Sequence, residues 1–557
     1  MTRIDFDALI AGWRGPALAA LIAVLAGMPG LLLAPVLDRQ EARFAQGSAQ
    51  MIESGDLALM RFQAEDRPQA APGAAWLQSV TANDLNGVAS RDIWRYRLPS
   101  LLGAALAAWA CAWGAIALFG QRAGTLAGLM MGTGFLASSA AGFATPDTLF
   151  TGSICLAMAA LARLYLDGRA DRRSPRLFKL AFWTGVGLSL LFNGFGGALI
   201  ALTVLIVLGL WDRRWRWMRR LGWGWGLPLA ALIAGPWAIA ATVATDGEIW
   251  TRMLADTPLG HVARGQVGWP GYQLILAPLL MFPFTLMLPA AAMTAITRRA
   301  EPGVRFAIAW LVPGWVALEL LPEQEWSHAL PLYGAVVWLA AGALTRPLGR
   351  PSRLAGTALA LFGGLYVTVA SLFLLSEFGG AGVQAWATPT IGLTVVAGAV
   401  GGFLLYHRQT LPALILSLTL GVLAHSTLAG VASNLRPLWV SSRLNDALVE
   451  TGLHPRLAKH PGPVAIAGYA EPSAVFLIGT GTELTDGAGA AAALAQGRPA
   501  VVDRTAEQDF LASAAGYGAA PEAAATVEGY NYSTGEPLVL TLYEPATATV
   551  PAVEPAP

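Results

Sequence analysis

The chain has 557 residues, of which 55% are hydrophobic and only 13% charged, and its mean hydropathy is +0.52. This composition excludes an ordinary soluble protein and indicates a polytopic membrane protein. The formal net charge of +1 gives no indication of a nucleic-acid partner. In a membrane protein the positions of the arginines are more informative than their sum.

About twenty apolar residues are needed to cross roughly 30 Å of hydrocarbon. Such segments are expected at 16–36, 98–119, 123–142, 148–162, 221–245, 271–296, 306–321, 329–344, 354–375, 387–406 and 411–431. The uncharged run 180–211 is too long for one crossing and contains NGFGG from Asn193, so it is predicted to form a hairpin of two short helices. The sequence therefore predicts an all-α membrane domain over residues 1–433 with about thirteen transmembrane helices.

The arginines indicate the orientation of these helices. With a cytoplasmic N-terminus, the arginine-rich loops, such as DRRWRWMRR and RPLGRPSR, all fall inside, and most acids fall outside. This distribution follows the positive-inside rule. We therefore expect the loop 38–97 and everything after Val431 to be external. Lipid or nucleic-acid binding by these basic loops is the less favoured interpretation.

The tail has a different pattern. Short strands are expected at 463–469, 499–503, 525–532 and 537–544, and helices at 471–479, 486–497 and 505–516. Residues 434–545 are therefore predicted to form a small external α/β domain. The proline- and alanine-rich segment 546–557 is predicted to be disordered.

Polar residues gather at the predicted external rim. The first loop is far longer than a simple connection and begins with Asp38, Glu41 and Arg43. Asp147 precedes an apolar span, where it could either face a polar cavity or cap the helix, and the spacing does not decide between these roles. Glu319 and His328 flank another external turn. We expect Asp38, Glu41, Arg43, Asp147, Glu319 and His328 to line one cavity that opens outward.

A series of motifs carries a family resemblance. LDRQEARFAQ, WLQSV, YRLPSLLGA, ATPDTLF, LPLYGAVVWLAA, GYAEPSAVFLIGT and EGYNYS occur in the order typical of one family. The chain resembles the bacterial protein O-mannosyltransferase-like glycosyltransferases of the GT-C fold, the group that includes the lipid A aminoarabinose (ArnT-like) transferases. This resemblance implies a polyprenyl-phosphate sugar donor, a lipid or other acceptor, and a place in the bacterial inner membrane with the C-terminal domain in the periplasm.

Several family positions are substituted. Gln40 stands where the family has an acid that activates the acceptor or positions the donor, while Glu41, Arg43 and Phe44 keep the rest of the motif. Family lysines are also missing, so phosphate binding is expected to pass to arginines. The expected substrate-binding residues are Gln40, Arg43, Arg61, Arg67, Arg264, Glu319 and His328. The family allows a divalent metal, but its usual histidine is replaced here, and no metal ligands are assigned.

Two functions of different classes follow. In the first, the chain is a membrane glycosyltransferase in which Asp147 or Glu41, with Asp38 as a further catalytic candidate, acts as the base or as an acid that orients the donor. Arg43 and its neighbours bind the phosphate leaving group. In the second, it is a catalytically silent homologue that binds a polyprenyl lipid or glycan, or acts as the protein partner of an active transferase. An amide at position 40 can orient a hydroxyl group but cannot accept its proton.

Overall fold

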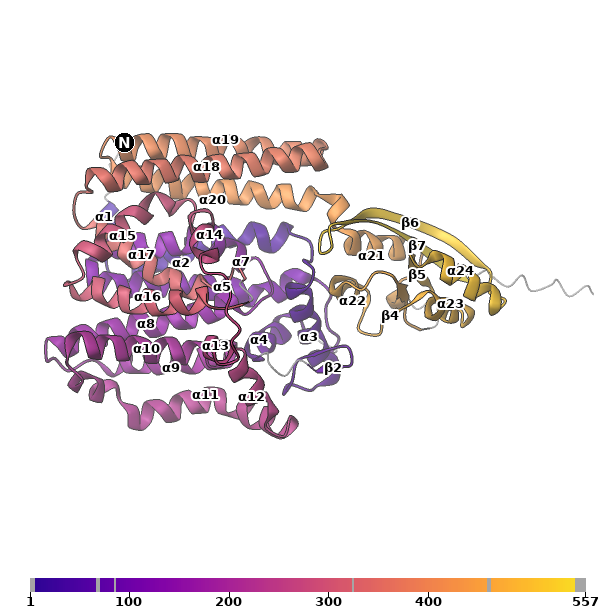
Figure 1. The fold of residues 1–557 in the computed structure, drawn as a ribbon, viewed down its shortest axis with the longest axis horizontal. Helices are drawn as coiled ribbons and strands as arrows, with labels where there is room; N and C mark the ends of the chain where they lie inside the picture. Colours follow the sequence, from indigo (N-terminus) through magenta and orange to yellow (C-terminus); the bar gives the residue numbers. More distant parts are fainter. Residues whose placement is uncertain (1–5, 67–70, 85–86, 323–324, 458–461, 546–557) are drawn as a thin grey trace, which may run out of the picture. The chain divides into compact units, whose positions relative to one another are not determined.

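The computed structural model describes residues 6–66, 71–84, 87–322, 325–457 and 462–545 (Figure 1). The chain divides into two compact units. The helical unit contains residues 1–34, 51–60 and 66–434, and the second unit contains residues 35–50, 61–65 and 435–557. The predicted disorder of 546–557 lies outside the described residues.

The helical unit consists of α-helices and short 3₁₀ turns. In chain order these are α1 Phe6–Ile10, α2 Arg14–Leu33, α4 Gly73–Ala82, α5 Ile93–Phe119, α6 Gln121–Thr133, α7 Phe135–Ala141, α8 Asp147–Arg169, α9 Arg176–Asn193, α10 Gly196–Asp212, η1 Arg216–Leu221, α11 Trp223–Ala244, α12 Glu248–Ala255, α13 Pro258–Ala263, α14 Tyr272–Leu280, η2 Phe284–Met287, α15 Leu288–Thr297, α16 Pro302–Glu319, α17 Leu330–Leu344, α18 Arg350–Phe378, α19 Ala381–Tyr406 and α20 Thr410–Asn434. The helix α3, Gln40–Ser54, contributes residues to both units.

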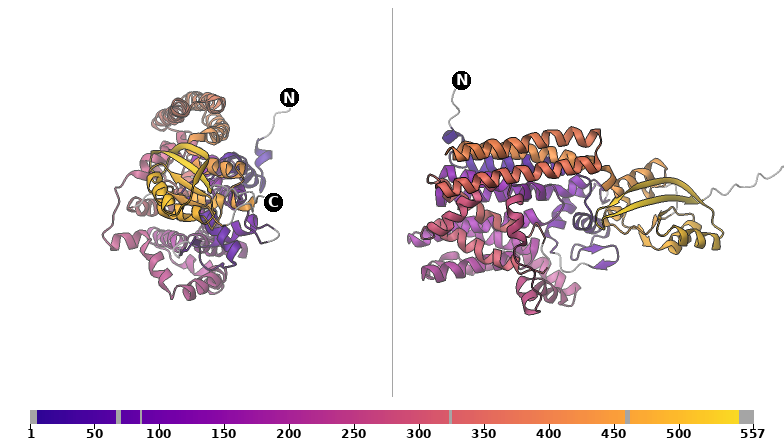
Figure 2. Two further views of the ribbon diagram at one scale, coloured as in Figure 1. Left: turned by 90° about the vertical axis from the view of Figure 1, so that its right-hand side faces the viewer. Right: turned by 45° about the horizontal axis from the view of Figure 1, so that its top comes forward.

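Seven of the described helices are long and apolar enough to cross a membrane, namely α2, α5, α8, α11, α18, α19 and α20. Helices α18, α19 and α20 run side by side in Figure 1, and the left view of Figure 2 shows them end-on as one group. The predicted multi-pass membrane protein is therefore confirmed. The number of about thirteen crossings stays a prediction, because α10 and α17 are shorter apolar helices.

The hairpin predicted for 180–211 is present. Helix α9 ends at Asn193 and α10 begins at Gly196, with Gly194 at a φ of 55° between them. The backbone at Gly194 is in the left-handed region that glycine adopts without steric cost. The glycine-rich turn thus breaks the apolar run where the sequence indicated.

The expected single crossing at 271–296 is interrupted in the structure. The segments 272–280 and 284–297 are bent by 116° relative to one another. Pro278 lies in the last turn of α14 and Pro283 lies in the break, and neither can donate a backbone hydrogen bond to continue a helix. The apolar composition of this segment indicated a span, but its prolines determine the bend.

Small residues allow close packing between the longest helices. A methyl group added at Gly103 of α5 would lie 2.5 Å from the backbone nitrogen of Leu149 in α8. Trp338 of α17 is fully buried, and its indole N–H donates to the carbonyl oxygen of Cys111 at 3.0 Å. Close backbone approach and satisfied buried polar groups are the means by which membrane helices associate.

The second unit contains a five-stranded sheet of order β4-β3-β5-β7-β6. Its elements are α21 Val440–Glu450, β3 Ala465–Ala467, α22 Pro472–Ile478, β4 Glu483–Thr485, α23 Gly487–Ala495, β5 Ala500–Asp503, α24 Glu507–Gly516, β6 Pro521–Asn531 and β7 Glu536–Pro545, with the 3₁₀ turns η3 Arg436–Leu438 and η4 Pro455–Leu457. β3 pairs in parallel with β4 and β5, whereas β7 is antiparallel to both β5 and β6. The predicted small α/β fold is confirmed.

The start of the first loop belongs to this second unit. Residues 35–50, which include the first part of α3, and the short strand β1, Arg61–Phe62, cluster with it; β1 pairs with β2, Glu65–Asp66. Three glutamines make the connection within the unit. Gln46 donates to the Thr480 hydroxyl at 2.7 Å, and Gln63 donates to the carbonyl oxygens of Thr480 and Thr482. Gln50 bonds to the backbone of Gln63 through both its amide oxygen and its amide nitrogen.

Candidate functional site

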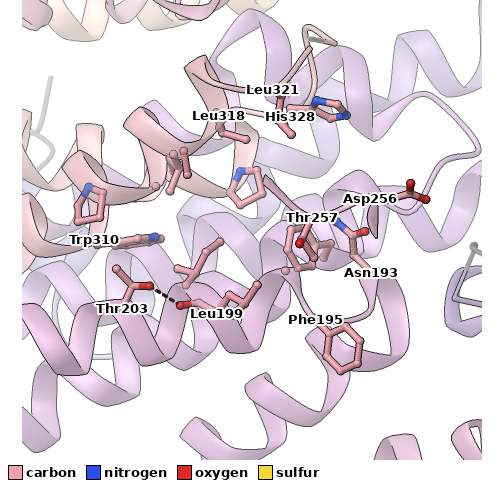
Figure 3. A pocket seen from close by; sticks show the side chains of 18 of the residues that line it. Asn193, Phe195, Leu199, Thr203, Asp256, Thr257, Trp310, Leu318, Leu321 and His328 are labelled. Carbon is pink, nitrogen blue, oxygen red and sulfur yellow. Dashed lines mark hydrogen bonds between the residues drawn. The ribbon is translucent and has the colours of Figure 1, made fainter. Parts of the chain in front are cut away.

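A cavity of about 430 Å³ lies within the helical unit, lined by α10, α16 and the adjoining turns (Figure 3). One part of its wall is apolar, with Leu199, Ile200, Trp310, Pro313, Leu318 and Leu332 among its residues. The other part is polar and contains Asp147, Asn193, Asp256, Thr257, Ser327 and His328. A largely apolar cavity with a few convergent polar groups is the usual form of a small-molecule site.

Asp147 lies at the polar part of the cavity, as the first residue of α8. Pro146 occupies the N-cap position, and no side chain caps the helix. Asp147 therefore does not act as the cap residue, which was the alternative role. The Thr145 hydroxyl donates to Asp147 Oδ2 at 2.8 Å, and Ser327 lines the same part of the cavity. The imidazole of His328 lies close enough to interact with it electrostatically.

Glu319 has a different surrounding. It is buried at the end of α16, and its carboxylate accepts hydrogen bonds from the backbone N–H groups of Gly271 at 2.7 Å and Leu274 at 3.0 Å. Trp315 Nε1 also donates to it at 3.0 Å. Glu319 is not among the residues that line the cavity. It fixes the first turn of α14, where the backbone N–H groups lack helical partners.

The turn that carries His328 is held by α14 as well. Gln273 Nε2 donates to the carbonyl oxygen of Glu325 at 2.6 Å. His328 Nε2 lies 3.6 Å from a carboxylate oxygen of Glu325. His328 is thus placed at the cavity by a turn whose backbone is fixed from outside the cavity.

No lysine or arginine is among the described residues that line the cavity. Among the predicted phosphate ligands in the described ranges, Arg264 is the one bonded next to a cavity residue. Its guanidinium donates to the carbonyl oxygen of Ala255 at 2.9 Å, and Ala255 directly precedes the cavity residue Asp256. Arg264 also bonds to Gln266 Oε1 at 3.2 Å, and its guanidinium lies 3.1 Å from His261 Nδ1.

The remaining predicted site residues that the structure describes belong to the second unit. Glu41 is buried and accepts a hydrogen bond from the backbone N–H of Leu37 at 2.9 Å, at the start of α3. Gln40 and Arg43 are exposed on the first turns of this helix, and Arg61 is exposed in β1. Arg67 lies outside the described residues. The expectation that residues from both parts of the chain line one cavity stays a prediction, as do the roles assigned to them.

Asp38 lies in a polar cluster of the second unit. Its backbone N–H donates to the Tyr532 hydroxyl at 2.5 Å, and its carboxylate accepts from the Ser473 backbone N–H at 3.0 Å. The Ser473 hydroxyl donates to Ser441, which bonds to the Tyr469 hydroxyl at 2.8 Å. Burial raises the pKa of the Asp38 carboxyl from 3.8 to about 6, and the nearby Glu471 carboxylate acts in the same direction.

This pKa leads to a testable dependence of stability on pH. The pKa of Asp38 is higher in the folded unit, so the folded state binds more protons than the unfolded state between about pH 4 and 6. Asp38 therefore lowers stability as pH rises through this window. Asp38→Asn keeps a carbonyl oxygen for Ser473 and should remove that loss. In thermal melts of the full chain, we expect the melting temperature of the variant to exceed that of the wild type at pH 7 and to approach it at pH 4.5. A difference in melting temperature that is the same at both pH values would contradict this role.

Sequence reasoning found Asp147 and His328 but missed several of their neighbours in the cavity. Asp256 and Thr257 lie at the C-terminal end of α12 and the N-cap of α13, in a loop that showed only scattered polar residues. Asn193 was visible as part of the NGFGG turn, but only as a helix break. Among the described residues, no group of three or more His, Cys, Asp or Glu could hold a metal ion.

Comparison with known proteins finds similarity to the family that the sequence motifs resemble. Residues 31–246 match the model of the dolichyl-phosphate-mannose-protein mannosyltransferase family. The undecaprenyl phosphate-alpha-4-amino-4-deoxy-L-arabinose arabinosyl transferase of Pseudomonas paraeruginosa is 27% identical over 325 residues, which is 57% of this chain and 57% of that relative. The chain therefore matches little more than half the length of this curated relative.

Solved structures extend the likeness in fold to almost the whole chain. The crystal structure of ArnT from Cupriavidus metallidurans bound to undecaprenyl phosphate has a TM-score of 0.74 at 20% identity, covering 94% of this chain and 97% of that chain. The apo structure of the same protein has a TM-score of 0.72 at the same identity and coverage. Together with the family match, these findings confirm the predicted resemblance to ArnT-like GT-C glycosyltransferases.

Proposed function

We propose, from the premise that the chain resembles ArnT-like GT-C glycosyltransferases in sequence and fold, that it is a membrane glycosyltransferase with a polyprenyl-phosphate-linked sugar as donor. The acceptor is a lipid, glycan or protein on the periplasmic face. The observation that carries this proposal is the cavity of the helical unit, which combines an apolar wall with the carboxylate of Asp147 and the imidazole of His328.

The two parts of the cavity suit the two parts of such a donor. Leu199, Ile200 and Trp310 offer an apolar surface to an isoprenoid chain, which gains free energy by leaving water. Asn193 and Thr257 offer amide and hydroxyl groups to sugar hydroxyls. Arg264 is proposed to contact the phosphate, because a guanidinium group can bind phosphate through two parallel hydrogen bonds.

Asp147 is proposed as the general base. It would take the proton of the acceptor hydroxyl while that oxygen attacks the anomeric carbon of the sugar, and the bond from this carbon to the phosphate oxygen would break. The polyprenyl phosphate leaves with the bonding electrons. Thr145 orients the carboxylate for this step.

A substitution that fills the cavity tests the donor site. Thr203 lines the apolar part, whereas the adjacent Leu202 is half exposed and is not among the lining residues. Thr203→Trp should abolish the binding of undecaprenyl phosphate to the purified protein, and Leu202→Trp should leave it unchanged. Native mass spectrometry of both variants and the wild type measures the bound fraction. Equal binding by the two variants would show that undecaprenyl phosphate does not bind in this cavity.

The silent homologue is the second candidate, because Gln40 stands at the position of the family acid. Gln40→Asp provides an ionisable oxygen beside Glu41 at the start of α3. In an active transferase we expect this substitution to raise turnover several-fold. An effect of about 10²-fold, the low end of what a general base contributes, is the upper bound of this expectation. The measurement is transfer from a labelled polyprenyl-phosphate sugar, with Gln40→Asn as the uncharged control. No transfer by any variant, with lipid binding retained, would favour the silent homologue.

The membrane topology belongs to the same proposal. The arginine-rich loops support a cytoplasmic N-terminus, about thirteen crossings of the bacterial inner membrane and a periplasmic C-terminal domain of residues 434–545. If the chain is a catalytically silent homologue, we propose that an active transferase is its protein partner. A reporter fused after Tyr543 should be active only in the periplasm, and activity in the cytoplasm would contradict this orientation.

A further inference from the structure

A short segment between α10 and α11 concentrates arginine and tryptophan. Residues 211–225, here called the Arg-Trp segment, read WDRRWRWMRRLGWGW and contain the 3₁₀ turn η1. Its five arginines, Arg213, Arg214, Arg216, Arg219 and Arg220, are all exposed. This segment has no role in the cavity described above.

The fold holds this segment in one shape. Trp217 is buried and packs edge-to-face on Tyr165 of α8, with ring centroids 5.5 Å apart. Trp183 Nε1 donates to the carbonyl oxygen of Leu221 at 2.9 Å, and Trp223 Nε1 donates to that of Met218 at 2.7 Å. The arginines are therefore presented by a fixed turn with an apolar anchor.

The acid within the segment does not neutralise these arginines. The buried Asp212 carboxylate is bound by Arg169 at 2.6 Å, by Arg305 and by the Tyr165 hydroxyl at 2.6 Å. Of the five arginines, Arg220 pairs with Asp171 at 2.7 Å. In the described part of the chain, no ion pair joins an acid to Arg213, Arg214, Arg216 or Arg219. Arg172 and Arg173 are also exposed, beside Asp171.

Exposed tryptophans accompany the positive charge. The exposed fractions of Trp215, Trp223 and Trp225 are 48%, 38% and 42%. Tryptophan is enriched where a membrane protein meets the headgroup layer, since its ring is apolar and its N–H is polar. Guanidinium groups bind phosphate oxygens, and anionic lipids attract clustered arginines. Arginine clusters alone would also fit nucleic acid, but the exposed indoles at the ends of two apolar helices favour a lipid.

We propose that the Arg-Trp segment binds the phosphate headgroup of an anionic phospholipid of the bilayer. Arg214, Arg216 and Arg219 contact the headgroup, and Trp215 lies at the boundary between headgroup and acyl chains. The inference is independent of the donor site, because it concerns other residues and another class of lipid.

The test compares two triple variants of the full chain in detergent micelles. Arg214→Gln/Arg216→Gln/Arg219→Gln removes charge from the segment, and Arg299→Gln/Arg350→Gln/Arg408→Gln removes the same charge from exposed positions on three other basic loops. Native mass spectrometry measures the bound fraction of phosphatidylglycerol, with phosphatidylcholine as the uncharged comparison. We expect the first triple variant to bind phosphatidylglycerol roughly tenfold more weakly or worse, and the second to bind like the wild type.

Further variants distinguish a loss of lipid binding from a folding defect of the triple variant. The single variants Arg214→Gln and Arg219→Gln should each lose part of the binding, and Trp215→Leu should weaken it without a change of charge. Equal losses in both triple variants would overturn the proposal, because net charge alone would then explain binding. No preference for phosphatidylglycerol over phosphatidylcholine, or binding of single-stranded RNA in place of lipid, would also overturn it.

Discussion

Replacing Asp147 with asparagine is expected to lower the transfer rate by about 10²–10⁴-fold, the contribution typical of a general acid or base. The asparagine keeps the size of the side chain and can still accept a hydrogen bond from Thr145, but it cannot take a proton from an acceptor hydroxyl. The measurement is the initial rate of transfer from a labelled polyprenyl-phosphate sugar in reconstituted membranes.

Asp256→Asn is the matched control, because Asp256 is the other carboxylate that lines the cavity and is exposed at its edge. We expect this variant to keep most of the activity. A loss of similar size in both variants would mean that the cavity needs negative charge in general and not a proton acceptor at Asp147. An unchanged rate of transfer by Asp147→Asn would show that Asp147 is not the general base.

Replacing Arg97 with methionine should destabilise the helical unit by about 1–3 kcal/mol, the cost of leaving buried polar groups without partners. Arg97 is fully buried in α5, and one guanidinium nitrogen donates to the carbonyl oxygens of Gly30 and Leu31 at 3.3 Å and of Ala34 at 2.5 Å. These carbonyls are at the C-terminal end of α2, where the last carbonyls of a helix lack helical donors, although that of Gly30 also accepts from the Ala34 backbone N–H at 3.2 Å. Unfolding of the purified protein in mixed micelles measures the difference.

Arg95→Met provides the comparison two residues away. Arg95 is partly exposed and pairs with Asp84 at 2.6 Å, an ion pair of the kind that contributes about 0–1 kcal/mol. We expect a clear loss of stability for Arg97→Met and a small one for Arg95→Met. Similar losses would indicate that general charge removal matters more than the bonds to α2.

Patterns along the chain predicted those parts of the fold that depend on local composition. The hairpin at Asn193 followed from an uncharged run and its glycines, and the strands β3, β5, β6 and β7 followed from short apolar stretches between turns. β4 was missed because only three residues form it, at the edge of the described sheet, where it pairs with β3. The bend at 281–283 was missed because an apolar segment with prolines still has the hydropathy of a single span.

The candidate site was predictable only in part, because its geometry depends on residues far apart in the sequence. Asp147 and His328 drew attention as polar residues at the ends of apolar spans, and the structure places both at one cavity. Glu319 drew attention for the same reason, yet its carboxylate bonds to the backbone of α14. Which of these acids faces a cavity and which satisfies a helix end depends on the break at 281–283 and on the turn after α16.

The turn that carries His328 is secured mainly through backbone groups. Glu319 bonds to the N–H groups of Gly271 and Leu274, and Gln273 bonds to the carbonyl oxygen of Glu325. The side chains of residues 325–328 can therefore be exchanged without loss of either attachment. Of these residues, Ser327 and His328 line the cavity, so substitutions at these two positions should change its proposed sugar-binding surface while the helices around it keep their places.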